Sequence, residues 1–196
     1  MILGSHNSLS FLTPNKWWMK LFNFYYKTQD KNLVEQIKSG VHMFDIRVRF
    51  TTDGLVKICH NGWEYKNAFV IDDFVNIILD TIRIHKIDDE KYYIRLVLET
   101  SETRFGQELM FIDLGNCFKK MADENIVIFG GQRKFDWSRV IVTIPDYFVA
   151  CPVSTMDKRC RWYEKICPRW FAKRMNKKTQ ILWEKEKHCI VAFDFV

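Results

Sequence analysis

The chain has 196 residues, of which 47% are hydrophobic and 28% are charged, and its formal net charge is +6. This length suits one domain with its own core, and the apolar content is that of a globular protein. No stretch is long and apolar enough to span a bilayer, and the first residues lack the basic and apolar regions of a secretion signal. We therefore expect a single domain, residues 1–196, that is cytoplasmic or peripherally membrane-associated.

The positive charges cluster between residues 159 and 178 and elsewhere mix with acidic residues. This distribution permits binding to nucleic acid or to an anionic lipid surface, but it requires neither. The basic segment contains no recognisable nucleic-acid-binding module, so we expect no nucleic acid partner. Six cysteines at scattered positions, without a secretion signal, favour reduced thiols. The oligomeric state cannot be read from the sequence.

The first forty residues predict a strand followed by helices. Residues 1–7 begin apolar and turn polar around His6, which is typical of a strand that ends in a loop. Asp30 is expected to cap a helix that runs through Ser39 and ends at Gly40. Gly40 then leads directly into a strand.

Between these elements, Pro14–Tyr26 predicts a helix with aromatic residues on more than one side. One interpretation is a helix packed against the core. The other is an interfacial helix, because Trp17 and Trp18 beside Lys16 and Lys20 suit the headgroup region of a membrane.

Val41–Phe50 reads as a strand that carries charges where a strand should be buried. If its charged face is exposed, the segment is an ordinary amphipathic edge strand. If the sheet is covered on both sides, Asp45 and Arg47 form a desolvated pair, which is destabilising unless it has a use. With a period of two, one face carries Phe44, Ile46, Val48 and Phe50, and the other carries Met43, Asp45, Arg47 and Arg49.

The remaining sequence alternates predicted strands with predicted helices. Further strands are expected at Leu55–Cys59, which delivers His60, and at Lys91–Thr100, Ile126–Phe129, Val140–Ile144 and Cys189–Val196. Helices are expected at Asp72–His85, at Gln107–Asp123 and over part of Lys158–Lys178.

This alternation predicts an α/β fold with a mainly parallel sheet covered on both faces, which favours the desolvated pair. Six or seven strands are indicated, fewer than the eight of a TIM (β/α) barrel, so we expect an incomplete or open barrel. In such a barrel, polar groups at the carboxyl ends of strands face the mouth. The residues expected there are His6, Asp45, Arg47, His60, Glu99 and Asp194.

Two histidines with carboxylates and an arginine suit phosphodiester cleavage. This reaction needs a base for a hydroxyl proton, an acid for the leaving oxygen, and a fixed cation for the phosphoryl oxygens. Histidine can fill both proton roles near neutral pH, and arginine matches phosphate geometry. Taken alone, His6 and His60 could equally be satisfied loop or core histidines.

Four motifs resemble the catalytic X domain of the phosphatidylinositol-specific phospholipase C family. They are Gly4–Ser8 around the first histidine, Gln36–Arg47 around the second-strand motif, Lys57–Gly62 around the second histidine, and Ile190–Val196 around the late aspartate. The match is specific over residues 1–62, moderate over the last eight residues, and loose between them.

The resemblance implies a distorted TIM barrel and cleavage through a cyclic inositol phosphate. By this resemblance, His6 would be the general base on the inositol 2-hydroxyl, and Asp194 would orient it. His60 would protonate the diacylglycerol oxygen with support from Asp45. Phospholipid at a membrane surface would be the partner.

Arg47 stands where metal-independent bacterial members keep an arginine and where calcium-dependent eukaryotic members keep a metal ligand, so the resemblance implies no cofactor. Asn7 and Glu99 are instead similar to eukaryotic calcium ligands, and a residual calcium site of Asn7, Asp45 and Glu99 stays open. Without a metal, Glu99 is expected to pair with Arg47 or Arg95. Asn7, Arg47, Glu99 and Arg95 are the expected substrate-binding residues.

Two alternatives remain at this stage. One is a metal-dependent barrel phosphodiesterase, such as a glycerophosphodiesterase or a sphingomyelinase D. The other is a catalytically silent barrel that binds membrane or protein through Trp17, Trp18 and the basic segment Arg159–Lys178. The acidic metal triad required by the first conflicts with Arg47, and a silent barrel would not need both histidines.

Overall fold

A computed structural model describes residues 1–60, 63–87, 89–99, 105–130, 148–151, 158–165, 167–183 and 189–196. The described strands are β1 (Ile2–Ser5), β2 (Met43–Phe50), β3 (Val56–His60), β4 (Trp63–Phe69), β5 (Tyr92–Leu98), β6 (Ile126–Gly130), β7 (Phe148–Cys151) and β8 (Ile190–Phe193). The described helices are α1 (Trp17–Tyr26), α2 (Leu33–Lys38), α3 (Ile71–His85), α4 (Phe105–Met121) and α5 (Pro168–Trp183), with a 3-10 turn η2 (Trp162–Lys165) before α5.

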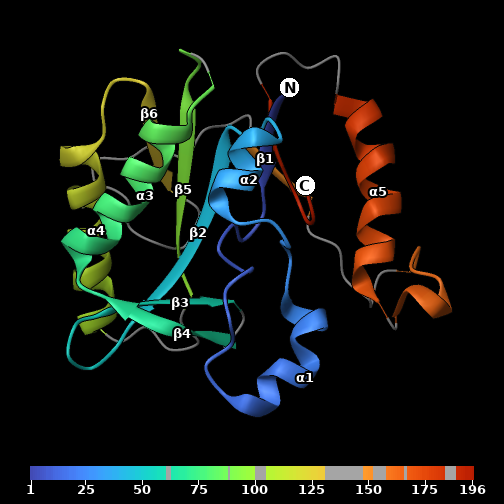
Figure 1. Ribbon diagram of the computed structural model, residues 1–196, viewed down its shortest axis with the longest axis horizontal. Helices are drawn as coiled ribbons and strands as arrows, with labels where there is room; N and C mark the ends of the chain where they lie inside the picture. Colours follow the sequence, from blue (N-terminus) through green and yellow to red (C-terminus); the bar gives the residue numbers. More distant parts are fainter. Residues whose placement is uncertain are drawn as a thin grey trace.

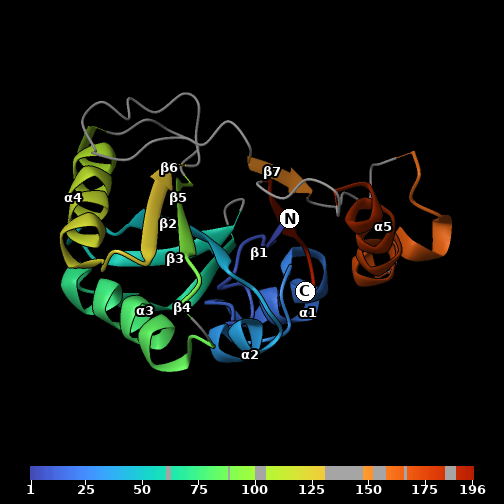
Figure 2. The same cartoon turned by 90° about the horizontal axis from the view of Figure 1, so that it is seen from above.

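All eight of these strands belong to one curled sheet (Figure 1). Its parallel part has the order β6-β5-β2-β1-β8-β7. Within the described ranges no pairing joins β6 to β7, so this part of the chain forms an open barrel. The expected α/β fold with an incomplete TIM-type barrel is confirmed. The helices α3 and α4 lie on one flank of the sheet and α5 on the opposite flank (Figure 2).

The strand β2 is central, so the edge-strand interpretation of this segment is wrong. It pairs with β5 along one side, and with β1 and then β3 along the other. On its outer face, Phe44, Ile46 and Val48 join the main core beneath the helices. On its inner face, Met43 is fully buried and packs with Phe129 and others inside the curl of the sheet. Both faces of β2 are therefore covered, as the alternation of strands and helices along the chain predicted.

The starts of the first two helices differ from the sequence prediction. The helix α1 begins at Trp17 rather than Pro14, because Pro14 forms an antiparallel bridge with a residue of β4. The helix α2 is capped by Asn32, not Asp30. The Asn32 side chain accepts from the backbone of Glu35, whose carboxylate accepts in return from the backbone of Asn32. This capping box satisfies two otherwise unpaired backbone donors, which a cap at Asp30 could not do.

A hairpin of β3 and β4 interrupts the parallel arrangement. The predicted strand after Gly54 exists, but it runs antiparallel to β2, and β4 after it was not predicted. The strand β7 was not predicted either, and the expected strand at Val140–Ile144 lies outside the described residues. None of the helices in the described segments is both long and apolar enough to cross a membrane.

The close approach of β1 to β8 depends on Gly4. A Cβ atom there would lie 3.3 Å from the backbone Cα of Ala192 and in collision with the Met43 side chain. We expect Gly4→Val to lower the free energy of unfolding by about 1–3 kcal/mol through overpacking, measured by urea denaturation. Gly106→Ala is the matched control, because a Cβ atom at this helical glycine meets nothing closer than 3.8 Å. Equal stability of both variants would contradict the packing argument.

Candidate active site

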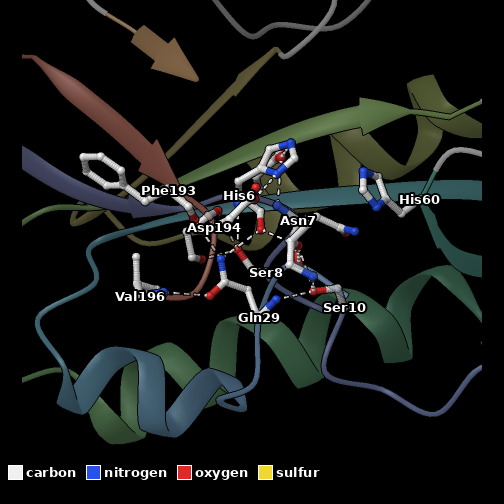
Figure 3. Close-up of polar contacts among 12 residues, drawn as sticks. His6, Asn7, Ser8, Ser10, Gln29, His60, Phe193, Asp194 and Val196 are labelled. Carbon is white, nitrogen blue, oxygen red and sulfur yellow. Dashed lines mark hydrogen bonds and ion pairs between the residues drawn. The ribbon is translucent and has the colours of Figure 1, made fainter. Parts of the chain in front are cut away.

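The strand register brings the two histidines together on one edge of β2. The pairing of β1 with β2 ends at Ser5 and Phe44. The strand β3 pairs with the far part of β2 as far as Val48 and Ile58, and it runs in the opposite direction to β1. The ends of β1 and β3 therefore face each other. His6 follows β1 and His60 ends β3, so the two rings lie edge to face with centroids 5.7 Å apart. The sequence predicted that His60 follows the carboxyl end of a parallel strand. In the structure it ends β3, which runs antiparallel to β2. Figure 3 shows both rings above the loop that follows β1.

His6 is oriented by Asp194, which follows β8. Because Ser5 and Phe193 are register partners, the residues after them leave neighbouring strands side by side. The Nδ1 atom of His6 lies 2.7 Å from Oδ1 of Asp194, and both side chains are buried (Figure 3). A proton on Nδ1 that is donated to Asp194 leaves the lone pair of Nε2 directed into the site.

Asp45 is a fully buried carboxylate that two arginines neutralise. Its Oδ2 accepts from Nε of Arg47 at 2.9 Å, and its Oδ1 accepts from Nη1 of Arg95 at 3.1 Å. The backbone N–H of Asn7 donates to Oδ2 at 3.0 Å. Burial disfavours the charged form, but Arg47 and Arg95 outweigh it and hold the pKa of Asp45 well below its usual range. The desolvated pair inferred from the strand pattern is therefore present.

Arg47 joins the carboxylates to His6. Its Nη2 lies 2.7 Å from Nε2 of His6, and its Nη1 donates to Glu99. Burial alone would lower the pKa of Arg47, but the charges of Asp45 and Glu99 raise it above the usual value. Arg47 therefore keeps a fixed positive charge beside the Nε2 atom of His6.

Asn7 has a left-handed backbone conformation next to His6. Its φ angle of 46° lies in a region that glycine and asparagine adopt more readily than most residues. The side chain is fully buried, yet among the described residues neither its Nδ2 nor its Oδ1 has a hydrogen-bond partner. A buried amide without partners is destabilising by itself, which is typical of a group that is completed by a ligand.

His60 is held by α1 rather than by Asp45, the support that the sequence analysis expected. Its Nδ1 lies 3.0 Å from the carbonyl oxygen of Tyr26, the last residue of α1. The Tyr26 ring stacks on Trp63 at a centroid distance of 4.0 Å, which joins α1 to the hairpin. Burial, followed by the nearby His6 and Arg47, lowers the pKa of His60 below its ordinary value of 6.5.

The candidate calcium ligands do not fit a metal ion in this arrangement. The guanidinium of Arg47 forms ion pairs with both Asp45 and Glu99, so a cation is already present between the two carboxylates. A divalent ion there would be repelled by Arg47 and would have to displace it. The expected pairing of Glu99 with Arg47 is present, and Asn7 is the remaining candidate ligand.

The expected membrane-contact residues lie on α1, next to the hairpin. Trp17 is 75% exposed, and Leu21 and Phe22 on the same helix are also exposed. Trp18 is half-exposed and packs edge to face against Trp63 at 5.6 Å. The helix therefore combines both interpretations, because one side packs and the other presents aromatic and aliphatic groups to solvent.

A network of buried polar residues lies beneath the site, and part of it falls outside the motifs found in the sequence. Ser8 accepts from the backbone N–H of Asp45 at 2.8 Å, and Ser10 accepts from the backbone of Thr28 and Gln29. Ser10, Thr28 and Gln29 lie in loops outside the recognised motifs and carry no periodic signal, so only the tertiary contacts identify them. The buried members nearest His6 are Ser5, Ser8, Ser10, Thr28 and Gln29, of which Ser5 and Ser8 lie within the motif around His6.

All five expected catalytic residues, His6, Asp45, Arg47, His60 and Asp194, meet at this site, together with the expected binding residues Asn7, Glu99 and Arg95. One imidazole has an oriented lone pair, a second faces it, and a permanent cation lies beside the first. Such a set can remove a proton from a hydroxyl, return one to a leaving oxygen, and stabilise an anionic centre.

The comparisons with known proteins point to one family. The chain is similar to 1-phosphatidylinositol phosphodiesterase from Staphylococcus aureus strain Newman and strain NCTC 8325 / PS 47, with 41% identity over 64 residues in each case. The matched segment spans 33% of this chain but only 19% and 18% of these relatives. A scan against protein-family profiles finds no match.

The fold as a whole is similar to phosphatidylinositol-specific phospholipase C from Listeria monocytogenes. The TM-score is 0.63 at 16% identity, and the similarity covers 99% of this chain and 87% of that one. At this identity the comparison shows the fold, which is a TIM-like barrel. Together with the sequence matches, it confirms the resemblance to the phosphatidylinositol-specific phospholipase C family.

The electrostatics of the site predict how His60 titrates. Because burial and the positive charge of Arg47 both disfavour its protonated form, His60 should titrate below 6.5 in nitrogen-labelled histidine NMR spectra. Arg47→Gln should raise the pKa of His60, because it removes the positive charge that disfavours the protonated imidazole. A titration at or above 6.5 in the unmodified protein would contradict the description of the site.

Proposed function

We propose that this chain cleaves the phosphodiester bond of phosphatidylinositol, or of a related glycerophospholipid, in the manner of a phospholipase C. The observation that carries the proposal is the buried pair of His6 and Asp194, with Arg47 at Nε2 and His60 across the site. The similarity to the Staphylococcus aureus phosphodiesterases, 41% identity over 64 residues, supports it. The similarity to the Listeria monocytogenes enzyme supports the fold.

In this proposal His6 is the general base. The inositol 2-hydroxyl binds beside Nε2, next to Nη2 of Arg47, and Nε2 accepts its proton. Asp194 holds the Nδ1–H tautomer and stabilises the imidazolium that forms. The freed 2-oxygen attacks phosphorus and forms the new P–O bond of a five-membered cyclic phosphate.

His60 is the general acid. It donates the Nε2 proton to the diacylglycerol oxygen as the P–O bond to that oxygen breaks, so the products are diacylglycerol and a cyclic inositol phosphate. In the ligand-free protein its lowered pKa disfavours the protonated form. The negative charge of a bound phosphate would raise the pKa of His60, so substrate binding itself would favour the protonated form that acts as the acid.

Arg47 stabilises the charge that develops on the phosphoryl oxygens. Its guanidinium is held by Asp45 and Glu99, so it is oriented before the substrate binds. The unpartnered amide of Asn7 is positioned to hydrogen-bond the same headgroup. Arg95 contributes indirectly, by neutralising Asp45.

A metal-dependent phosphodiesterase is the weaker candidate. Its chemistry needs a divalent ion among carboxylates that here already bind Arg47. We therefore expect no cofactor requirement, including no requirement for calcium.

Access to a lipid substrate is proposed to involve α1. Its last carbonyl accepts from His60, and both Trp18 and Tyr26 pack on Trp63, so this helix lies next to the hairpin that carries His60. Lys16 and Lys20 beside the exposed Trp17 suit a negatively charged bilayer surface. The protein would then bind the membrane peripherally with its site directed at the headgroups.

Turnover is tested by phosphorus NMR with phosphatidylinositol in mixed micelles, with and without a calcium chelator. We expect a cyclic inositol phosphate signal that survives chelation and disappears in His6→Ala. Arg47→Ala should lower kcat by about 100- to 1000-fold, because it removes the fixed donor to the phosphoryl oxygens. Arg49→Ala is the matched control, since Arg49 lies on the same strand face and pairs with Glu64 instead.

Each other result would redirect the proposal. A signal that requires calcium would show that Arg47 can be displaced by the ion. Absence of turnover with and without calcium would contradict the phosphatidylinositol lyase proposal, and intact vesicle binding would then favour the silent barrel. Equal losses in Arg47→Ala and Arg49→Ala would indicate a structural defect.

Vesicle sedimentation tests the role of α1. Trp17→Ala should weaken binding to phosphatidylinositol-containing vesicles by about tenfold, as expected for losing one large apolar side chain from the interface. Ile84→Ala is the control, because Ile84 is 73% exposed but lies on α3. Equal binding by both variants would exclude α1 as the contact surface.

A further inference from the structure

Gln29 lies fully buried directly beneath the paired His6 and Asp194 (Figure 3). Its Nε2 donates to the carbonyl oxygen of His6 at 3.0 Å and to that of Phe193 at 2.8 Å. Its Oε1 accepts from the backbone N–H of Val196 at 3.2 Å. Both contacts of Nε2 are carbonyls and the contact of Oε1 is an N–H group, so the network itself determines the orientation of the amide.

These contacts lie where the pairing of β1 with β8 ends. The last paired residues are Ser5 and Phe193, and the last backbone bond runs from the N–H of His6 to the carbonyl of Phe193 at 2.8 Å. Beyond this point the two backbones are no longer held by strand pairing. Gln29 adds one further connection between them, from a segment that belongs to neither strand.

We infer that Gln29 is a positioning residue for the general base, and this inference rests on the proposed function. It fixes the backbone of His6 relative to the residue before Asp194, and so sets the distance between Nδ1 and Oδ1, which is 2.7 Å. It also holds Val196 behind Asp194, so the backbone on both sides of this aspartate is fixed. A small displacement of a catalytic group is enough to slow a reaction strongly.

Removal of the Gln29 amide should leave the fold in place, which makes the inference testable. The Phe193 carbonyl would keep the N–H of His6 as a donor. The His6 carbonyl would keep the hydroxyl of Thr28, which donates to it at 3.0 Å. Neither buried carbonyl would therefore lose all its partners, and the large penalty for an unsatisfied buried group would be avoided.

Gln36 provides a matched control. It is also fully buried, and its Nε2 also donates to two carbonyl oxygens, those of Ser8 at 2.8 Å and Lys31 at 2.7 Å. Among the described residues its amide donates only to these two carbonyls, neither of which belongs to His6 or Asp194. A general effect of removing a buried glutamine amide would therefore appear in both Gln29→Met and Gln36→Met, whereas a positioning effect would appear only in the first.

The experiment compares the two variants in the full chain by NMR and by kinetics. In nitrogen-labelled histidine spectra, the Nδ1 proton shared with Asp194 should shift or broaden in Gln29→Met and stay unchanged in Gln36→Met. With phosphatidylinositol in mixed micelles, Gln29→Met should lower kcat by about 10- to 100-fold with little change in KM. Both variants should show a cooperative thermal transition, and if Gln29→Met does not fold, Gln29→Asn replaces it.

The outcomes separate the inference from the proposed function. Equal changes in both variants, or an unchanged His6 signal in the Gln29 variant, would overturn the positioning role. A changed His6 signal with unchanged kcat would also overturn it. If the unmodified protein does not cleave phosphatidylinositol, the proposed function fails, and the histidine spectra alone still decide whether Gln29 positions His6.

Discussion

The carboxylate of Asp45 is fully buried, and the charges of Arg47 and Arg95 compensate it. A carboxylate in this position would otherwise be strongly destabilising, so the surrounding groups must stay in place. The same carboxylate accepts from the backbone of Asn7 and fixes the guanidinium that reaches His6. The electrostatic balance around one residue therefore holds the end of β1, the inner face of β2 and the candidate base in one arrangement.

The fold supports this balance from two directions. The parallel strands place His6 and Asp194 side by side at the ends of β1 and β8. The antiparallel hairpin then brings His60 back along the free part of the β2 edge. Because β1 and β3 share this edge of β2, the residues that end both strands, His6 and His60, meet beside it. The hairpin also packs against α1, which connects the exposed aromatic helix to His60.

Arg47 is the cation that lies between the carboxylates of Asp45 and Glu99. A guanidinium gives permanent charge and directional donors, and it needs no exchange with solvent ions. Because the carboxylates of Asp45 and Glu99 both pair with Arg47, these side chains have less freedom to move. The side-chain amide of Asn7 takes no part in this pairing, and neither of its polar atoms has a hydrogen-bond partner among the described residues.

The sequence alone determined the strand pattern around Asp45 and Arg47, the presence of two histidines after strands, and the alternation that predicts an α/β barrel. These features are local, because periodicity and motif spacing are properties of neighbouring residues. Only the tertiary structure decided that β3 is antiparallel, that Asn32 rather than Asp30 caps α2, and that Tyr26 rather than Asp45 holds His60. Only the tertiary structure, likewise, places Gln29 beneath His6 and Asp194. Such contacts join residues far apart in the chain, and a single loop glutamine has no pattern from which its partners could be inferred.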